Sequence, residues 1–151
     1  MNNYPEWWNE TITVYNKHIN PVTDMVTWYR TVIPDCFWKE AGVKVLVGST
    51  VIDTNSVICR IRVNENFMDV MAWKDALPEA LETHFTLQPG DIIVKGEVTD
   101  TIDEYTAGQR ASDLMEKYVN CLMIDMATVN VGGGRGNEHY LVKFDTKAKK
   151  L

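Results

Sequence analysis

The sequence predicts a mainly β fold: a β-barrel or sandwich of short antiparallel strands with helical insertions, α+β by content. Short segments rich in β-branched residues alternate polar and apolar side chains, turn residues separate these segments, and only two stretches have helical spacing. The chain has 151 residues, 45% of them hydrophobic, which is enough material for one core. We therefore expect a single domain over residues 1–151, without an internal repeat or an interdomain linker.

Predicted strands follow one another along most of the chain. Their ranges are 11–15, 25–33, 36–38, 43–47, 57–63, 92–98, 121–131 and 139–144. The first two form a hairpin around the turn at Asn20-Pro21, and Pro34-Asp35 is expected to break the second strand. Residues 101–105 are expected to be extended.

Two stretches interrupt this pattern with helical spacing. Residues 71–84 are predicted to be an insertion between strands, in which Pro78 starts a new helical turn. Residues 107–119 are the best predicted helix, with an Asp113–Lys117 pair at the favourable spacing of four. Residues 1–10 form an N-terminal arm, and residues 145–151 a polar, frayed tail.

The chain is acidic, with a formal net charge of −6 and a pI near 5.0. No basic stripe is visible, and tight nucleic-acid binding requires lysines and arginines that neutralise phosphates. An acidic wall can still lie close to DNA without gripping it, because it repels the polymer. The composition therefore excludes a typical DNA-binding protein but allows non-specific proximity to DNA in a channel.

The cysteines and the N-terminus indicate a reducing compartment. Cys36, Cys59 and Cys121 are widely spaced and odd in number, so we interpret them as small half-buried hydrophobic residues. The polar, acidic N-terminus is not typical of a signal peptide, and no apolar run approaches the ~20 residues that span a bilayer. We expect synthesis in the cytoplasm and no membrane partner.

No residue pattern indicates catalysis. The glycine-rich segment 132–137 leads into a predicted strand, whereas a phosphate-binding loop leads into a helix. His18, His84 and His139 lack the spacing of metal ligands. The carboxylates at 100–104 are those of a turn that approaches a helix. We expect no catalytic, cofactor-binding or metal-binding residues, no cofactor, and no enzymatic activity.

Two segments are candidate interaction elements, to which the insertion 71–84 can be added. The first is the glycine-rich loop, several copies of which can meet at the centre of a ring or dock onto a neighbour. It consists of Gly132, Gly133, Gly134, Arg135, Gly136 and Asn137. The second comprises Tyr4, Trp7 and Trp8, which either plug one end of a barrel or contact a partner protein.

Several sequence strings occur here in a recognisable order. They are WNETITVYNKHINPVTDMVTWYRTVIPDCFW at residues 8–38, GDIIVKGEV at 90–98, and EHYLVK at 138–143, which follows the glycine-rich loop. Together they resemble a small protein encoded in the head-to-tail gene block of phages and prophages of Gram-positive bacteria. The second string is similar to a turn and strand found late in the barrels of head-closure, or stopper, proteins.

This resemblance implies a ring-forming structural protein of the phage neck. Its partners would be other copies of itself, a portal or adaptor protein on one side, and tail proteins on the other. Its location would be the neck, or connector region, of the virion, and the host cytoplasm during assembly. The alternatives are a tail terminator, a tail-completion protein or a minor capsid protein. A small-ligand-binding β-barrel, with a pocket lined by Trp28, Trp38 or Trp73, is a further alternative.

Overall fold

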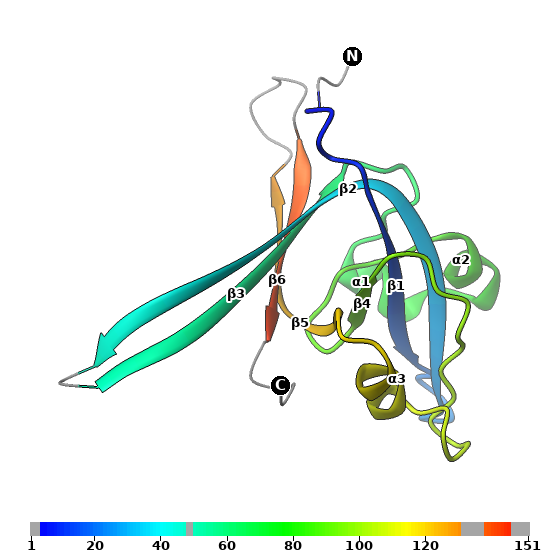
Figure 1. The fold of residues 1–151 in the computed structure, drawn as a ribbon. Helices are drawn as coiled ribbons and strands as arrows, with labels where there is room; N and C mark the ends of the chain where they lie inside the picture. Colours follow the sequence, from blue (N-terminus) through cyan, green and yellow to red (C-terminus); the bar gives the residue numbers. More distant parts are fainter. Residues whose placement is uncertain (1–3, 48–49, 131–137, 146–151) are drawn as a thin grey trace.

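The computed structural model describes residues 4–47, 50–130 and 138–145. Six antiparallel strands close into a barrel in the order β1-β2-β3-β6-β5-β4. This confirms the predicted mainly β fold with helical insertions (Figure 1). The strands are β1 (Glu10–Ile19), β2 (Val26–Val47), β3 (Thr50–Arg62), β4 (Ile92–Lys95), β5 (Cys121–Asn130) and β6 (His139–Asp145). The helices are α1 (Val70–Asp75), α2 (Pro78–Thr83) and α3 (Ala111–Lys117).

The barrel encloses the main core. Alternate residues of its strands point inward, as Ile12 and Val14 of β1 do, and both are fully buried. A second, smaller cluster lies outside the barrel wall beneath α3 and includes Ile92, Val94 and Leu114. Because β4 is covered on both faces, its sequence is a continuous apolar run rather than an alternating one.

All three cysteines are more buried than the sequence predicts. Cys36 and Cys59 lie in the barrel core and Cys121 lies beneath α3; each has no exposed surface, and none of the three is joined in a disulfide. The expectation of half-buried thiols was wrong because strand alternation directs these three positions to covered faces.

Strand β2 is continuous through Pro34-Asp35, so the predicted break there was wrong. The register shifts between Glu10 and Ile12 of β1, which face Cys36 and Ile33 of β2, and β2 therefore carries an extra residue at this point. Asp35 adopts a positive φ of 58°. A β-bulge tolerates a proline that lacks an N–H donor and bends the strand instead of ending it.

Beyond this bulge, β2 and β3 leave the barrel together. β2 pairs with β1 only as far as Cys36, and β3 pairs with β6 only from Ile58 onward. Within the described chain, residues 39–47 and 50–57 pair with no third strand, and Figure 1 shows them projecting away from the barrel. We call this two-stranded projection the β2–β3 ribbon. The sequence predicts two short separate strands here, at 43–47 and 57–63, and does not predict that the two strands pair over the whole length of the ribbon.

The helical regions differ from prediction in their limits. The insertion 71–84 forms two short helices, α1 and α2, with Pro78 in the first turn of α2 as predicted. The helix expected over 107–119 is only α3, because Gly108 takes a positive φ of 86° within a turn and the chain becomes extended at Tyr118.

The segments on either side of α3 also differ from prediction. The segment expected to be extended over 101–105 ends in a turn at Glu104 and Tyr105, where the Asp103 carboxylate accepts hydrogen bonds from the Tyr105 N–H and the Thr106 hydroxyl. The Lys117 ammonium pairs with Asp100 at 2.6 Å, not with Asp113 as the helical spacing predicts. Residues 146–151 of the predicted tail lie outside the described residues, and Asp145 ends β6.

Candidate functional site

The N-terminal arm is fixed to one end of the barrel by two aromatic residues. Trp8 is buried and packs against Phe37, with ring centroids 6.0 Å apart, and edge-on against His139 at 5.6 Å. The Tyr4 hydroxyl donates a hydrogen bond to the Glu138 carbonyl oxygen (2.5 Å) and accepts one from the Val63 N–H (3.2 Å). Tyr4 and Trp8 thus occupy the plugging position that the sequence offered as one of two alternatives.

Trp7 has the opposite environment to its neighbour. The Trp8 N–H donates to the Pro5 carbonyl oxygen at 3.1 Å and closes a tight turn that contains Glu6 and Trp7. Trp7 is 66% exposed, and the Glu6 side chain beside it is also exposed. The fixed turn therefore presents the large indole of Trp7 and the carboxylate of Glu6 to solvent. Tryptophan is one of the residue types that dominate the binding energy of protein interfaces.

A groove lies at the other end of β1. Its walls come from the last residues of β1, the turn that follows β1, helix α1, and the Gln88-Pro89 turn before β4. Its volume is about 520 Å³, and its surface is mainly apolar. We call it the α1 groove. This volume lies inside the range of ~300–1,000 Å³ that is usual for binding pockets.

Aromatic rings form the inner part of the α1 groove. Trp73 of α1 is almost fully buried and meets His18 of β1 edge-on, with ring centroids 6.2 Å apart. Tyr29 of β2 contacts both rings edge-on, at 5.9 Å from Trp73 and 6.5 Å from His18. The Trp73 indole N–H donates to the Lys17 carbonyl oxygen at 3.0 Å, so α1 is tied to the end of β1.

Lysines give the α1 groove a cationic character. Lys17 and Lys74 are among its lining residues, and neither forms a salt bridge within the described chain. One carboxylate, Asp24, also lines the groove from the turn that follows β1, where it has a positive φ of 59°. The Lys17 ammonium lies 6.0 Å from the centre of the Trp28 ring, so Lys74 is the lining lysine whose ammonium has no partner among the described residues. In a chain with a net charge of −6, a mainly apolar groove with such a lysine is a local exception.

A buried carboxylate supports the groove from behind. Asp91 is 1% exposed, and its carboxylate accepts hydrogen bonds from the Asn16 amide (2.7 Å), the Lys17 N–H (3.0 Å) and the Gln88 amide (3.2 Å). The same Gln88 amide donates to the Lys17 carbonyl oxygen at 3.0 Å. The Asn16 amide also bridges to the backbone of Thr86. The network therefore fixes the groove residues Lys17 and Gln88 in one arrangement.

Burial dominates the protonation of this carboxylate. It raises the pKa of Asp91 from 3.8 to about 7, although the hydrogen bonds from Lys17, Asn16 and Gln88 oppose the shift because they favour the anion. Asp91 makes no salt bridge in the described part of the chain. The carboxylate therefore titrates near neutral pH at the base of the groove.

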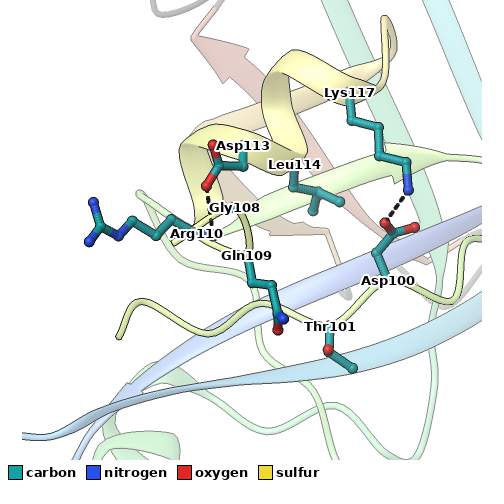
Figure 2. A pocket seen from close by; sticks show the side chains of 8 residues that line it. All are labelled: Asp100, Thr101, Gly108, Gln109, Arg110, Asp113, Leu114 and Lys117. Carbon is teal, nitrogen blue, oxygen red and sulfur yellow. Dashed lines mark hydrogen bonds and ion pairs between the residues drawn. The ribbon is translucent and has the colours of Figure 1, made fainter. Parts of the chain in front are cut away.

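A second, smaller hollow of about 120 Å³ lies beside α3 (Figure 2). Three of its charged side chains, Asp100, Asp113 and Lys117, already have partners within the chain. Asp100 accepts hydrogen bonds from Lys117 (2.6 Å) and the Tyr118 hydroxyl (2.5 Å), which lower its pKa, and the Asp113 carboxylate accepts from the Arg110 N–H at the start of α3. Figure 2 shows the Arg110 side chain directed away from the hollow. These contacts fasten α3 to the barrel and leave little for a ligand.

The sequence-predicted interaction residues do not gather at one place. The loop Gly132–Asn137 lies outside the described residues. Of the three tryptophans proposed for a ligand pocket, only Trp73 lines the α1 groove. Trp38 is buried in the barrel core against Phe144, and the Trp28 indole N–H donates to Glu104 at 3.1 Å on the outer wall.

Sequence reasoning missed the groove residues His18, Lys74 and Gln88 and the buried Asp91 that bonds to Gln88. Asp91 lies 75 positions from its other partner Asn16, and such residues meet only when the barrel closes. A possible signal was Asp91, an acidic residue that opens the most apolar strand in the chain.

Two further findings concern the described residues alone. None of their His, Cys, Asp and Glu side chains form a group of three or more placed to hold a metal ion. None of the helices in residues 4–47, 50–130 and 138–145 is long and apolar enough to cross a membrane.

The fold and site define a small closed β-barrel with a projecting ribbon, an anchored aromatic arm and a cationic groove. Residues 7–143 match the model of a family of unknown function, DUF6751, and the chain belongs to that family. Neither the curated proteins nor the solved structures gave a match.

Proposed function

We propose that this protein is a structural, ring-forming component of the tailed-phage neck, a head-closure (stopper) or head-tail connector protein that joins the DNA-filled head to the tail. The observation that carries the proposal is the β2–β3 ribbon. A closed barrel has no free strand edge in its wall, so neighbouring copies cannot extend its sheet there, whereas the projecting ribbon offers them strand edges.

The composition of the ribbon supports a contact role. Between Ala41 and Ser56 the only charged residues are Lys44 and Asp53, which the register places opposite one another. Isolated two-stranded hairpins are at best marginally stable in water, and edges exposed to solvent usually carry more charge. A ribbon of this kind is therefore expected to gain its stability from a neighbouring subunit.

The remaining support comes from the sequence. The strings at residues 8–38, 90–98 and 138–143 resemble those of phage head-to-tail proteins, and the acidic composition suits a channel wall that does not hold DNA. On this proposal the partners are other copies of the chain, a portal or adaptor protein on one side and tail proteins on the other. A tail terminator, tail-completion or minor capsid protein would use the same projections.

Mass measurement by light scattering tests the proposal, on the protein alone and after mixing with purified portal-side proteins from the same gene block. We expect a ring, or capture of the chain onto the portal ring. A variant in which an Asn-Gly turn joins Glu40 directly to Val57, which already face one another in the ladder, removes the ribbon and should abolish this assembly. A wild-type chain that stays monomeric in both conditions would contradict the proposal.

One observation favours a second candidate, a small-ligand-binding barrel. The α1 groove has the volume and the apolar surface of a ligand pocket, with a few polar groups around it. This candidate predicts that the monomer binds a small apolar compound and that substitution of Trp73 weakens the binding. Screening of apolar carboxylates by thermal shift on wild type and Trp73→Phe distinguishes the two candidates.

A further inference from the structure

We propose that the α1 groove is the docking site for Glu6 and Trp7 of a second copy of the chain. This inference rests on the proposed function, since it identifies the contact through which neighbouring subunits of a ring would hold one another. The groove and the arm are two surface features to which the described residues provide no partner within the chain.

The two elements are complementary in chemistry. The arm presents the indole of Trp7, 66% exposed, beside the carboxylate of Glu6. The groove offers apolar walls that include Ile19 and Val70, an inner aromatic surface at Trp73, and lysines without salt bridges. An indole in this groove would contact aromatic and aliphatic groups, and the neighbouring carboxylate would lie at the cationic rim.

The geometry requires a second copy. Trp7 precedes the start of β1 and the groove lies at its end, so the length of β1, about 30 Å, separates them. Trp8 and Tyr4 fix the arm to the barrel, so Trp7 has no reach toward the groove of its own chain. A contact between different surfaces on two copies is heterologous, and repetition closes it into a ring or extends it as a filament.

The contact would act as an anchor within a larger interface. One tryptophan side chain buries ~150–250 Å², whereas a standard protein interface buries about 1,600 Å² in total. The rest must come from other surfaces, for which the β2–β3 ribbon is available. Because a fixed turn presents Trp7 and the Asp91 network fixes the groove, both sides are ordered before they meet, which reduces the entropy lost on binding.

The test pairs two full-length variants, so that each arm stays anchored to its own barrel. The donor is a fluorescein-labelled Lys74→Glu protein, which keeps the arm, and the acceptor is a Trp7→Ala protein, whose groove cannot be occupied by another copy's arm. With the donor well below the acceptor concentration, fluorescence anisotropy should show saturable binding. A donor that also carries Trp7→Ala, or an acceptor that also carries Lys74→Glu, should lose about 30-fold in affinity, the effect of a typical interface hot spot. Trp7 and Lys74 are exposed, so these variants should keep the wild-type circular dichroism spectrum.

A charge exchange makes the test specific. A donor that also carries Glu6→Lys should bind weakly to the Trp7→Ala acceptor and recover at least about tenfold on the Trp7→Ala/Lys74→Glu acceptor, because the opposite charges are restored. Saturable binding that is insensitive to Trp7 of the donor, or the absence of any binding, overturns the inference.

The outcomes separate this inference from the proposed function. Assembly of the wild-type chain on portal-side proteins, without binding between donor and acceptor, would overturn the docking contact and leave the neck role intact. Donor–acceptor binding by a chain that ignores those proteins would support the self-contact and overturn the neck role.

Discussion

The pKa of Asp91 predicts an unusual dependence of stability on pH. Its pKa is 3.8 in the unfolded chain and about 7 in the folded protein. Between these values the folded state binds more protons than the unfolded state, so the free energy of unfolding falls as pH rises. The difference of about three pKa units corresponds to roughly 4 kcal/mol in the limit, and to roughly 2.5 kcal/mol between pH 5 and pH 8.

Asp91→Asn removes this titration and keeps one oxygen for the Lys17 and Gln88 hydrogen bonds. The new amide group opposes the Asn16 amide donor, which costs about 1–3 kcal/mol at every pH. The informative quantity is therefore the change in the free energy of unfolding with pH. Urea unfolding followed by tryptophan fluorescence at pH 5, 6, 7 and 8 should show that the free energy of unfolding of wild type falls by roughly 2.5 kcal/mol relative to that of Asp91→Asn.

Asp100→Asn is the matched control. The pKa of Asp100 is lowered by its hydrogen bonds to Lys117 and Tyr118, so its carboxylate is ionised in both states throughout the same pH range. The free energy of unfolding of Asp100→Asn should therefore differ from that of wild type by the same amount from pH 5 to pH 8. If the wild-type and Asp91→Asn curves are also parallel, Asp91 does not titrate near neutral pH, and the three hydrogen-bond donors outweigh its burial.

Three further predictions concern the arm, the thiols and the ribbon. Trp8→Ala should lower the free energy of unfolding by about 3–5 kcal/mol and the adjacent Trp7→Ala by less than about 0.5, in urea titrations; equal effects would show that the arm is not anchored as described. A hydrogen bond to Cys36, together with burial, raises the pKa of the Cys59 thiol, so Ellman's reagent should react with the buried cysteines only after unfolding. Rapid reaction of the native protein would contradict their burial. The Glu40-Asn-Gly-Val57 variant should keep a cooperative thermal transition in calorimetry because it retains Val57, which packs against the barrel core, and loss of that transition would make the ribbon part of the folding unit.

The strand pattern was predictable because alternation is a local property. Ile12 and Val14 alternate with polar neighbours whatever lies across from them, and the hairpin of β1 and β2 follows from the turn at Asn20-Pro21. The continuity of β2 was not predictable, because Pro34-Asp35 has the local character of a break. Only pairing with β1 shows that the extra residue is accommodated as a bulge.

The site was harder to predict than the fold for the same reason. Trp7 and Trp8 are adjacent and chemically identical, and a single turn sends one into the core and the other into solvent. The groove joins His18 to Trp73 and Lys17 to Gln88 across long stretches of chain. No local pattern contains such pairs, although each residue was visible in the sequence as an isolated polar or aromatic residue.

Closure of the barrel and projection of the ribbon have one physical consequence in common. The barrel wall satisfies its own backbone hydrogen bonds, so it offers neighbouring copies no strand to extend. The ribbon has two outer strand edges and few charged residues, and an isolated two-stranded hairpin is at best marginally stable in water. If the chain associates as proposed, its contacts are therefore expected at the ribbon, the arm and the groove. If neighbours contact one another through the arm and groove, the ribbon can add area to that contact, and its removal should weaken assembly without unfolding the barrel.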